Sequence, residues 1–430
     1  MCNKQRNIDT FPTLVTKLLI SYHLYNTMFD KHYANKMLRN LLKKLENPER
    51  PLLGPNFKAL TFWGLLLPEN VYRKIFYLTM HLLVTVFTAT EYIDIWFVKN
   101  DINLLLNNVK ITFLATVSVA KITTFLAWQK HWKGIIEYVT KSDLAQRKSD
   151  NKKALINNYT KYCRKITYLY WFLMYTTVVI VMGQPLIKFI SSPSYRENVK
   201  NGTESYIEVV SSWVPFNKNT IYGHIAASFY QSYGAIYGGG WITSFDTNAI
   251  VIMVFFKAEL EMLRMDCADI FGKGEQVNHK EAKERLKNCH QRHVDLMANA
   301  RLFNSCLSPI MLLYMIVCSV MLCATAYQIS AESNPMQQFL IAEYLLFGIA
   351  QLFMFCWHSN DVYYASKDLM IGPYESEWWS RPKSEQKDIS MLVDQLNNTI
   401  VFTAGPFNNL SVATFINILK GAYSYYTLLN

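Results

Sequence analysis

The sequence predicts an all-α membrane protein with seven transmembrane helices, and three observations carry this prediction. Of the 430 residues, 51% are hydrophobic and 14% aromatic, whereas 17% are charged, a composition typical of membrane proteins with sizeable polar extensions. Apolar segments long enough to cross a bilayer recur along the chain. Lys and Arg collect in alternate connecting segments, as the orientation of membrane helices requires.

Residues 1–74 form the first predicted region, a basic segment with twelve Lys and Arg against five acidic residues. Within it, Phe57–Leu67 is apolar, but eleven residues are too few to span a bilayer, and Pro68 stops the run. We therefore expect an interfacial or re-entrant segment ahead of the first span.

Seven spans follow from the apolar runs. Lys110 and Lys121 weaken the second span, and interfacial aromatic residues such as Trp128 and Trp357 mark several ends. The predicted spans are Ile75–Val98, Ile102–Trp128, Ile166–Ile190, Ile221–Phe256, Ser305–Ile329, Phe339–His358 and Thr399–Leu429.

The charge of the loops orients these spans. Residues 129–165 carry ten Lys and Arg against three acidic residues, whereas the loops on the opposite side carry far fewer. The positive-inside rule therefore predicts a cytoplasmic N-terminus and, with an odd number of spans, an extracellular C-terminus. Asn201-Gly202-Thr203 is a glycosylation sequon in a predicted outer loop, so Asn201 is a candidate acceptor. Sequons at Asn158, Asn397 and Asn409 fall in or beside inner or membrane segments, so this cue supports the orientation without deciding it.

Two long inner segments predict a cytoplasmic helical bundle. The helical pattern of residues 255–302 continues well past the expected bilayer. Residues 361–398 contain apolar side chains, among them Leu369, Ile389 and Leu392, that need packing partners. We expect the two segments to pack together as an extension of the fourth, fifth and sixth spans.

The last predicted span carries one small and polar stripe at helical spacing. Such a stripe either packs closely against another helix or faces water in a pore. The pattern alone favours packing over a pore. The stripe consists of Ser411, Thr414, Asn417, Gly421, Ser424 and Leu428.

The same stretch resembles the C-terminal signature of insect odorant receptors. Pro406 and Tyr426 depart from the signature. The resemblance is carried by Thr403-Ala404-Gly405, Phe407, Leu410-Ser411, Thr414-Phe415, Ile418-Leu419-Lys420 and the run 423–429. It implies a subunit of a ligand-gated, non-selective cation channel in the plasma membrane of sensory dendrites, surrounded by membrane lipid. It also implies a heterotetramer with the shared odorant co-receptor, an anchoring inner bundle and a pore lined by the last helix.

The resemblance further implies a pocket for a small volatile odorant in the outer half of spans two to six. The chain then divides into residues 1–74, six spans with the pocket at 75–358, an anchor segment at 359–398 and the pore helix at 399–430. For each pocket residue, plain packing between helices is the alternative, and Glu343 is either a pocket wall or a carboxylate that reaches the interface. In the pore stripe, Leu428 is the candidate hydrophobic gate. The pocket candidates are Phe113, Tyr175, Val178, Met182, Phe229, Ser232, Tyr233, Phe339 and Glu343.

Other classes of function find less support. The net charge of +11 follows the loops and indicates orientation, not nucleic-acid binding. No hydrolase or metalloprotease motif occurs, so neither enzymatic activity nor a cofactor is expected. Cys289, His290 and His293 lack the second ligand pair that a zinc site needs, so no metal site is expected. A G-protein-coupled receptor is the alternative, but it requires an extracellular N-terminus and motifs that this sequence lacks.

Orientation separates the two receptor classes. An epitope tag after Asn430 is expected to bind antibody on intact cells, and a tag before Met1 only after permeabilisation. The reverse pattern would contradict the channel interpretation and favour a G-protein-coupled receptor.

Overall fold

The computed structural model describes residues 42–429 apart from 43, 101, 273–276 and 332–334, and this part of the chain is almost entirely helical. Its helices are α3 (Gly54–Phe62), α4 (Val71–Val98), α5 (Ile102–Ala127), α6 (Gln129–Gln146), η1 (Asp150–Lys152), α7 (Lys153–Ser191), α8 (Pro193–Lys200), α9 (Ile221–Ala268), α10 (His279–Ala331), α11 (Pro335–Lys367), η2 (Asp368–Met370), α12 (Ile371–Tyr374), η3 (Trp378–Ser380), α13 (Lys383–Leu396) and α14 (Val412–Leu429). Strands β1 (Thr403–Ala404) and β2 (Asn408–Asn409) form an antiparallel hairpin.

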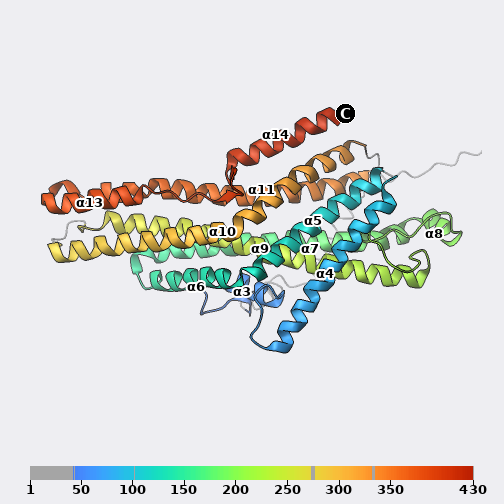
Figure 1. Cartoon of the computed structure of the whole chain (residues 1–430), viewed down its shortest axis with the longest axis horizontal. Helices are drawn as coiled ribbons and strands as arrows, with labels where there is room; N and C mark the ends of the chain where they lie inside the picture. Colours follow the sequence, from blue (N-terminus) through green and yellow to red (C-terminus); the bar gives the residue numbers. More distant parts are fainter. Residues whose placement is uncertain (1–41, 43, 101, 273–276, 332–334, 430) are drawn as a thin grey trace, which may run out of the picture.

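Long helices run side by side along the molecule (Figure 1), with α8 at one end and α13 at the other. Among the described residues, α4, α5, α7, α9, α10 and α11 are long and apolar enough to cross a membrane. The first six predicted spans fall on these six helices in order. Helix α14 has 18 residues and includes Asn417 and Lys420, which lower its hydropathy.

The predicted start of the last helix at Thr399 is wrong. Residues 403–409 form the β1–β2 hairpin, and α14 begins only at Val412. Gly405 has φ +66°, and its N–H donates to the carbonyl of Ser308 at 3.0 Å. A Cβ at Gly405 would lie 2.7 Å from Leu312, so a glycine fits this turn where a larger residue would not. Pro406, which follows, has no N–H to continue a helix.

The apolar segment predicted before the first span forms α3 and the turn after it. Asn56 and Leu60 of α3 are buried, and the carbonyl of Trp63 accepts a hydrogen bond from the Trp241 indole of α9 at 3.2 Å. Gln129 donates to the carbonyl of Leu65 at 3.2 Å. The protein therefore holds this segment by specific hydrogen bonds; of residues 1–41, in the same predicted region, nothing is described.

Beyond the predicted spans, α9 and α10 continue as the expected helical bundle. Arg292 of α10 pairs with Glu259 of α9 at 2.6 Å. Lys152, just before α7, pairs with Asp266 of α9 at 2.6 Å. These ion pairs between helices, together with the buried side chains of α13, hold the bundle together.

The spans meet at one carboxylate, that of Asp246 on α9. Lys121 of α5 pairs with it at 2.6 Å, and both side chains are fully buried. The Tyr170 hydroxyl of α7 donates to its other oxygen at 2.7 Å, and the Gln351 amide of α11 donates to the same oxygen at 2.5 Å. Three helices thus bind a fourth through one side chain. We call the four side chains the Asp246 cluster; they are Asp246, Lys121, Tyr170 and Gln351.

Aromatic rings surround the Lys121 ammonium in the Asp246 cluster. Its Nζ lies 5.1 Å from the ring centroid of Tyr314 on α10 and 5.5 Å from that of Phe245. Ring faces attract a cation, and their bulk keeps water away from the ion pair. Because both side chains are buried, water cannot solvate either charge if the other is removed, so each charge requires the other as its counter-ion.

Neutralising one partner is therefore expected to destabilise the fold. Asp246→Asn leaves the Lys121 charge buried without a counter-ion, at a cost of about 3–5 kcal/mol. The variant is expected to melt at lower temperature in detergent and to reach the cell surface in smaller amounts. Replacing both residues by apolar ones, Lys121→Met with Asp246→Leu, is expected to recover part of the loss.

The control is Glu137→Gln, which removes the exposed pair between Glu137 and Lys141 on α6. No measurable change is expected there, since exposed pairs stabilise little. Equal melting temperatures for Asp246→Asn and Glu137→Gln would show that the Asp246 cluster does not hold the helices together.

Candidate functional site

A large cavity of about 1100 Å³ lies among α4, α5, α7, α10, α11 and the segment before α9. This volume exceeds that of a small volatile ligand, which needs a few hundred Å³. Its lining is mixed, with both charged and aliphatic side chains. It comprises Asp94, Phe97, Val98, Leu104, Asn107, Lys110, Ile111, Ile180, Val181, Gln184, residues 204–211, Trp213, Val214, Phe216, Lys218, Asn219, Gln328, Ile341, Glu343 and Tyr344.

The segment 202–220 closes one side of the large cavity. Gln231 of α9 accepts the N–H of Val209 at 3.0 Å and donates to Glu208 at 2.6 Å. The N–H of Trp213 donates to the carbonyl of Thr90 on α4 at 3.1 Å. Hydrogen bonds to two helices therefore fix this segment as a wall.

Three carboxylates of the cavity wall have partners. Lys218 pairs with Glu208 at 2.5 Å and with Asp94 at 3.6 Å. Asp94 also accepts a hydrogen bond from Asn108 at 3.2 Å. Glu343 of α11 accepts one from the Thr177 hydroxyl of α7 at 2.5 Å.

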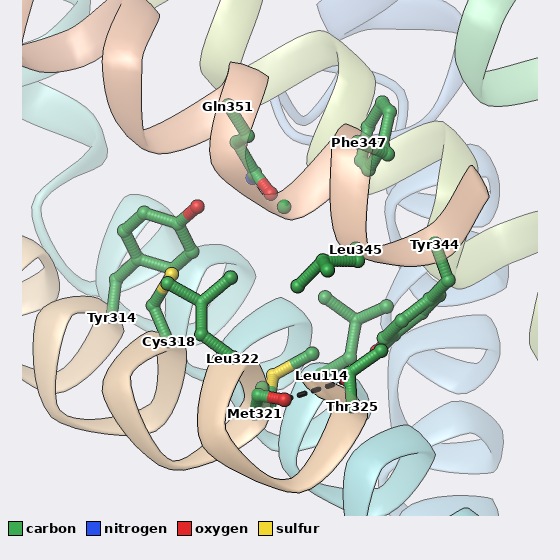
Figure 2. Close-up of a pocket in the computed structure, with 11 residues that line it drawn as sticks. Leu114, Tyr314, Cys318, Met321, Leu322, Thr325, Tyr344, Leu345, Phe347 and Gln351 are labelled. Carbon is green, nitrogen blue, oxygen red and sulfur yellow. Dashed lines mark hydrogen bonds between the residues drawn. The ribbon is translucent and has the colours of Figure 1, made fainter. Parts of the chain in front are cut away.

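A small cavity of about 30 Å³ lies deeper, between α10 and α11 (Figure 2). The side chains around it are mostly apolar, and the Thr325 hydroxyl donates to the carbonyl of Met321 at 2.6 Å. This volume accommodates about one water molecule, so a larger ligand enters only if side chains move. The lining consists of Leu114, Tyr314, Cys318, Met321, Leu322, Thr325, Tyr344, Leu345, Phe347, Gly348 and Gln351.

Tyr344 belongs to both cavities and separates them. Its hydroxyl donates to the backbone carbonyl of Lys110 at 3.4 Å. Gln351, one lining residue of the small cavity, binds Asp246 as described above. Among the described residues, Tyr344 is thus the one that the two linings share, and Gln351 connects the small cavity with the Asp246 cluster.

Among its described side chains, those of one face of helix α14 pack on the body of the protein. Ala422 is buried, Phe415 and Leu419 pack against the core, and the Phe415 ring lies 5.4 Å from that of Phe353 on α11. On the other face, Asn417 and Ser424 are exposed. The chain thus leaves the polar face of α14 uncovered.

The family follows from comparison with known proteins. The family model described as 7tm Odorant receptor matches residues 101–423. The chain belongs to this odorant receptor family. Odorant receptor Or2 of Anopheles gambiae is 21% identical over 388 residues, which is 89% of this chain and 98% of that relative. The odorant receptor coreceptor of the same species is 20% identical over 148 residues, or 34% of this chain and 31% of the coreceptor.

A solved structure of an odorant receptor has the same fold. It is the insect olfactory receptor OR5 from Machilis hrabei in complex with eugenol, with a TM-score of 0.74 and 16% identity over 87% of this chain and 96% of that one. This likeness confirms the predicted fold class, and the family match confirms the resemblance seen in the C-terminal residues. The family is one of receptors, not of enzymes.

In this odorant receptor, two of the predicted pocket residues lie at the large cavity or beside it. Glu343 lines it. Met182 packs in a small cluster with Phe87, Val209 and Val210, and both valines belong to the cavity wall. Their assignment to a ligand pocket stays a prediction.

Three other predicted pocket residues lie outside the linings of both cavities. Phe113 packs against the main hydrophobic core. Val178 lies against Gly239, where an added Cβ would meet it at 2.9 Å. Tyr175 lines a separate cavity of about 480 Å³ next to Trp63 and Trp171. The large and small cavities thus do not include these three in their linings.

Of the remaining pocket candidates, two lie at the surface of this chain and two are partly buried. Phe229 is 75% exposed and Phe339 is 63% exposed. Ser232 is half-buried, and the Tyr233 hydroxyl donates to the carbonyl of Met80 on α4 at 3.3 Å. The candidate glycosylation site Asn201 is exposed after α8.

The pore candidates divide into two groups. Ser411 precedes α14, and its oxygen accepts the N–H of Thr414 at 3.2 Å, as an N-cap does. Asn417, Gly421 and Ser424 lie along the uncovered face, where a Cβ at Gly421 would meet nothing within 4 Å. The backbone of Leu428 belongs to α14, while its side chain lies outside the described part of the structure.

Sequence reasoning missed the residues that define the cavities. Lys110 was interpreted only as weakening the second span, although a charge inside a span is a functional candidate in its own right. Asp246 and Tyr344 were not singled out at all. Leu322 and Leu345 carry no signal that separates a cavity wall from ordinary core.

Filling the small cavity is expected to weaken the response to ligands. Gly348 lines the small cavity, and a Cβ there would meet nothing within 4 Å, so Gly348→Leu adds bulk at the cavity without a backbone clash. Ligand-evoked current is expected to need at least about tenfold more ligand, while surface expression stays normal. The control is Gly134→Leu on α6, also without neighbours within 4 Å. Identical dose–response curves for both variants would exclude the small cavity from ligand action.

Proposed function

We propose that the chain is a subunit of a ligand-gated, non-selective cation channel, opened by a small volatile hydrophobic molecule. Family membership supports the receptor role. The observation that carries the channel mechanism is the position of α11, which lines both cavities and also contacts α14 through Phe353 and Phe415 at 5.4 Å. The match to the odorant receptor family does not favour the alternative of a G-protein-coupled receptor.

The ligand acts on α11 at the small cavity. The cavity as it stands holds about one water, so a ligand of several heavy atoms must displace Tyr344 or Leu345. Both residues belong to α11, as do Gln351, which binds Asp246, and Phe353, which contacts Phe415 of α14. A shift of α11 therefore reaches the last helix through a direct ring contact.

The uncovered face of α14 supports its role in the pore. Four subunits, including the shared co-receptor, bring this face of each α14 to a common axis. The partial likeness to the coreceptor of Anopheles gambiae is consistent with such an assembly. The charge of the loops supports a cytoplasmic N-terminus and an extracellular C-terminus. Family membership supports a location in the plasma membrane of a sensory dendrite.

Energetics limit how strongly the closed state is favoured. Micromolar binding corresponds to about 8 kcal/mol, and moving a two-state equilibrium from 1:99 to 99:1 requires about 5.5 kcal/mol of differential binding. A ligand of about a dozen heavy atoms is bounded at about 0.3–1.5 kcal/mol per atom, and only the part of its binding energy that differs between the two states moves the gate. The closed state is therefore favoured by only a few kcal/mol, and some opening without ligand is expected.

Thiol labelling tests the pore assignment. A cysteine at Ser424 is expected to react with a charged thiol reagent mainly while ligand is present, with a change in current. Ala422 lies on the face of α14 that packs against the rest of the protein and is buried, so a cysteine there is expected to stay unreactive. Equal labelling of both positions would mean that α14 does not line the pore.

A further inference from the structure

Two lysines line the large cavity, Lys110 of α5 and Lys218 of the segment before α9. They differ in their partners. Lys218 is paired with Glu208 at 2.5 Å and with Asp94 at 3.6 Å. Within the described residues, the Lys110 ammonium has no hydrogen-bond acceptor and no ion-pair partner.

Lys110 is nevertheless almost fully buried, with 6% of its surface exposed. Its Nζ lies 5.5 Å from the centroid of the Tyr344 ring, the aromatic wall between the two cavities. The ring face stabilises a cation but accepts no strong hydrogen bond. The ammonium thus borders the large cavity with its donors free for a ligand or for water.

The carboxylates of the same lining are already engaged. Asp94 accepts from Asn108, and Glu204 accepts from Asn198 at 3.4 Å. Glu208 pairs with Lys218, and Glu343 accepts from Thr177 at 2.5 Å. Each would have to give up a donor to neutralise Lys110. Within the part of the chain that the structure describes, the Lys110 charge therefore has no counter-ion in the cavity.

A buried ammonium without a partner is costly, and when no ligand is bound only water can satisfy its three donors. A ligand that displaces this water must supply an acceptor, or the charge is left unsatisfied. A carboxylate supplies both acceptors and the missing counter-charge, a carbonyl or ether oxygen supplies an acceptor only, and a hydrocarbon supplies neither.

We propose that Lys110 selects ligands by their polar end. The ligand is a small amphipathic molecule whose accepting oxygen, a carboxylate above all, binds the Lys110 ammonium. Its apolar part lies against Tyr344 and the aliphatic wall formed by Ile111, Val181 and Ile341. This proposal rests on the proposed function and adds the chemical class of the ligand.

The position of Lys110 also connects recognition with gating. The Tyr344 hydroxyl donates to the Lys110 carbonyl at 3.4 Å, so a ligand held by the ammonium contacts the residue that separates the cavities. An oxygen bound at Lys110 therefore directs the apolar part of the ligand towards Tyr344 and the small cavity behind it. Lys110 acts as a binding residue, and Tyr344 transmits the change to α11.

The test compares hexanoate, hexanone, hexanol and hexane on the receptor expressed with the co-receptor. These probes share one chain length and differ in the polar end. Wild-type receptor is expected to respond to them in the order given. Lys110→Met is expected to lose the preference for hexanoate over hexane by about 10- to 100-fold, whereas Lys110→Arg retains most of it.

The matched control is Lys99→Met, which removes an exposed lysine that lies 3.6 Å from the Trp96 ring, outside the cavity. It is expected to leave the order of the probes unchanged. Lys110→Met is also expected to melt no lower than wild type, because it removes a charge that has no partner. A merely structural lysine would lower the melting temperature instead.

The outcomes separate this proposal from the channel function. A wild-type receptor that responds to hexane as well as to hexanoate, or a Lys110→Met receptor with the wild-type order, would overturn the role of Lys110 and leave the channel intact. Absence of current with every probe, from a receptor present at the cell surface, would contradict the channel function. In that case, the melting temperature of the purified complex is measured with and without hexanoate. If hexanoate raises it in wild type but not in Lys110→Met, the site is still supported. If hexanoate raises it equally in both, the role of Lys110 is overturned.

Discussion

The buried ion pair between Lys121 and Asp246 is the constraint on which the membrane part of the protein depends. Its 2.6 Å contact joins α5 to α9, and the hydrogen bonds from Tyr170 and Gln351 to the same carboxylate add α7 and α11. Apolar packing alone leaves helices free to slide in a lipid environment, because lipid chains are as apolar as the side chains. One shared carboxylate fixes their relative rotation instead, since any other alignment would leave a charge unpaired.

Helix α11 connects the Asp246 cluster with the two cavities and with α14. Along its length it presents Glu343 and Tyr344 to the large cavity, Gly348 to the small one, Gln351 to Asp246 and Phe353 to α14. Gln351 itself carries no charge, so moving its amide away from Asp246 breaks one hydrogen bond but leaves the ion pair with Lys121 in place. The arrangement thus combines a fixed pair, between α5 and α9, with a movable helix that touches both the cavities and α14.

The sequence predicted the helices well and the contacts between them poorly, for physical reasons. Apolar runs are local, so six spans could be placed from them. The turn at Gly405 depends on its close approach to Leu312 of α10, which no local pattern reveals. Periodicity groups residues on one face of a helix but does not say what that face meets: Glu343 lines the large cavity, whereas Phe229 is mostly exposed. Lys110 and Lys121 are charged residues inside a predicted span, and on that ground alone they could have been named as candidate site residues.

The central claim is that ligand binding reaches α14 through its contact with α11. Cysteines at Phe353 and Phe415, whose rings lie 5.4 Å apart, allow the two helices to be joined by a short bifunctional thiol reagent. If α14 opens the pore by moving relative to α11, joining them abolishes ligand-evoked current while ligand still protects the receptor from heat, and each single cysteine responds normally. Undiminished current from the joined receptor would contradict the claim.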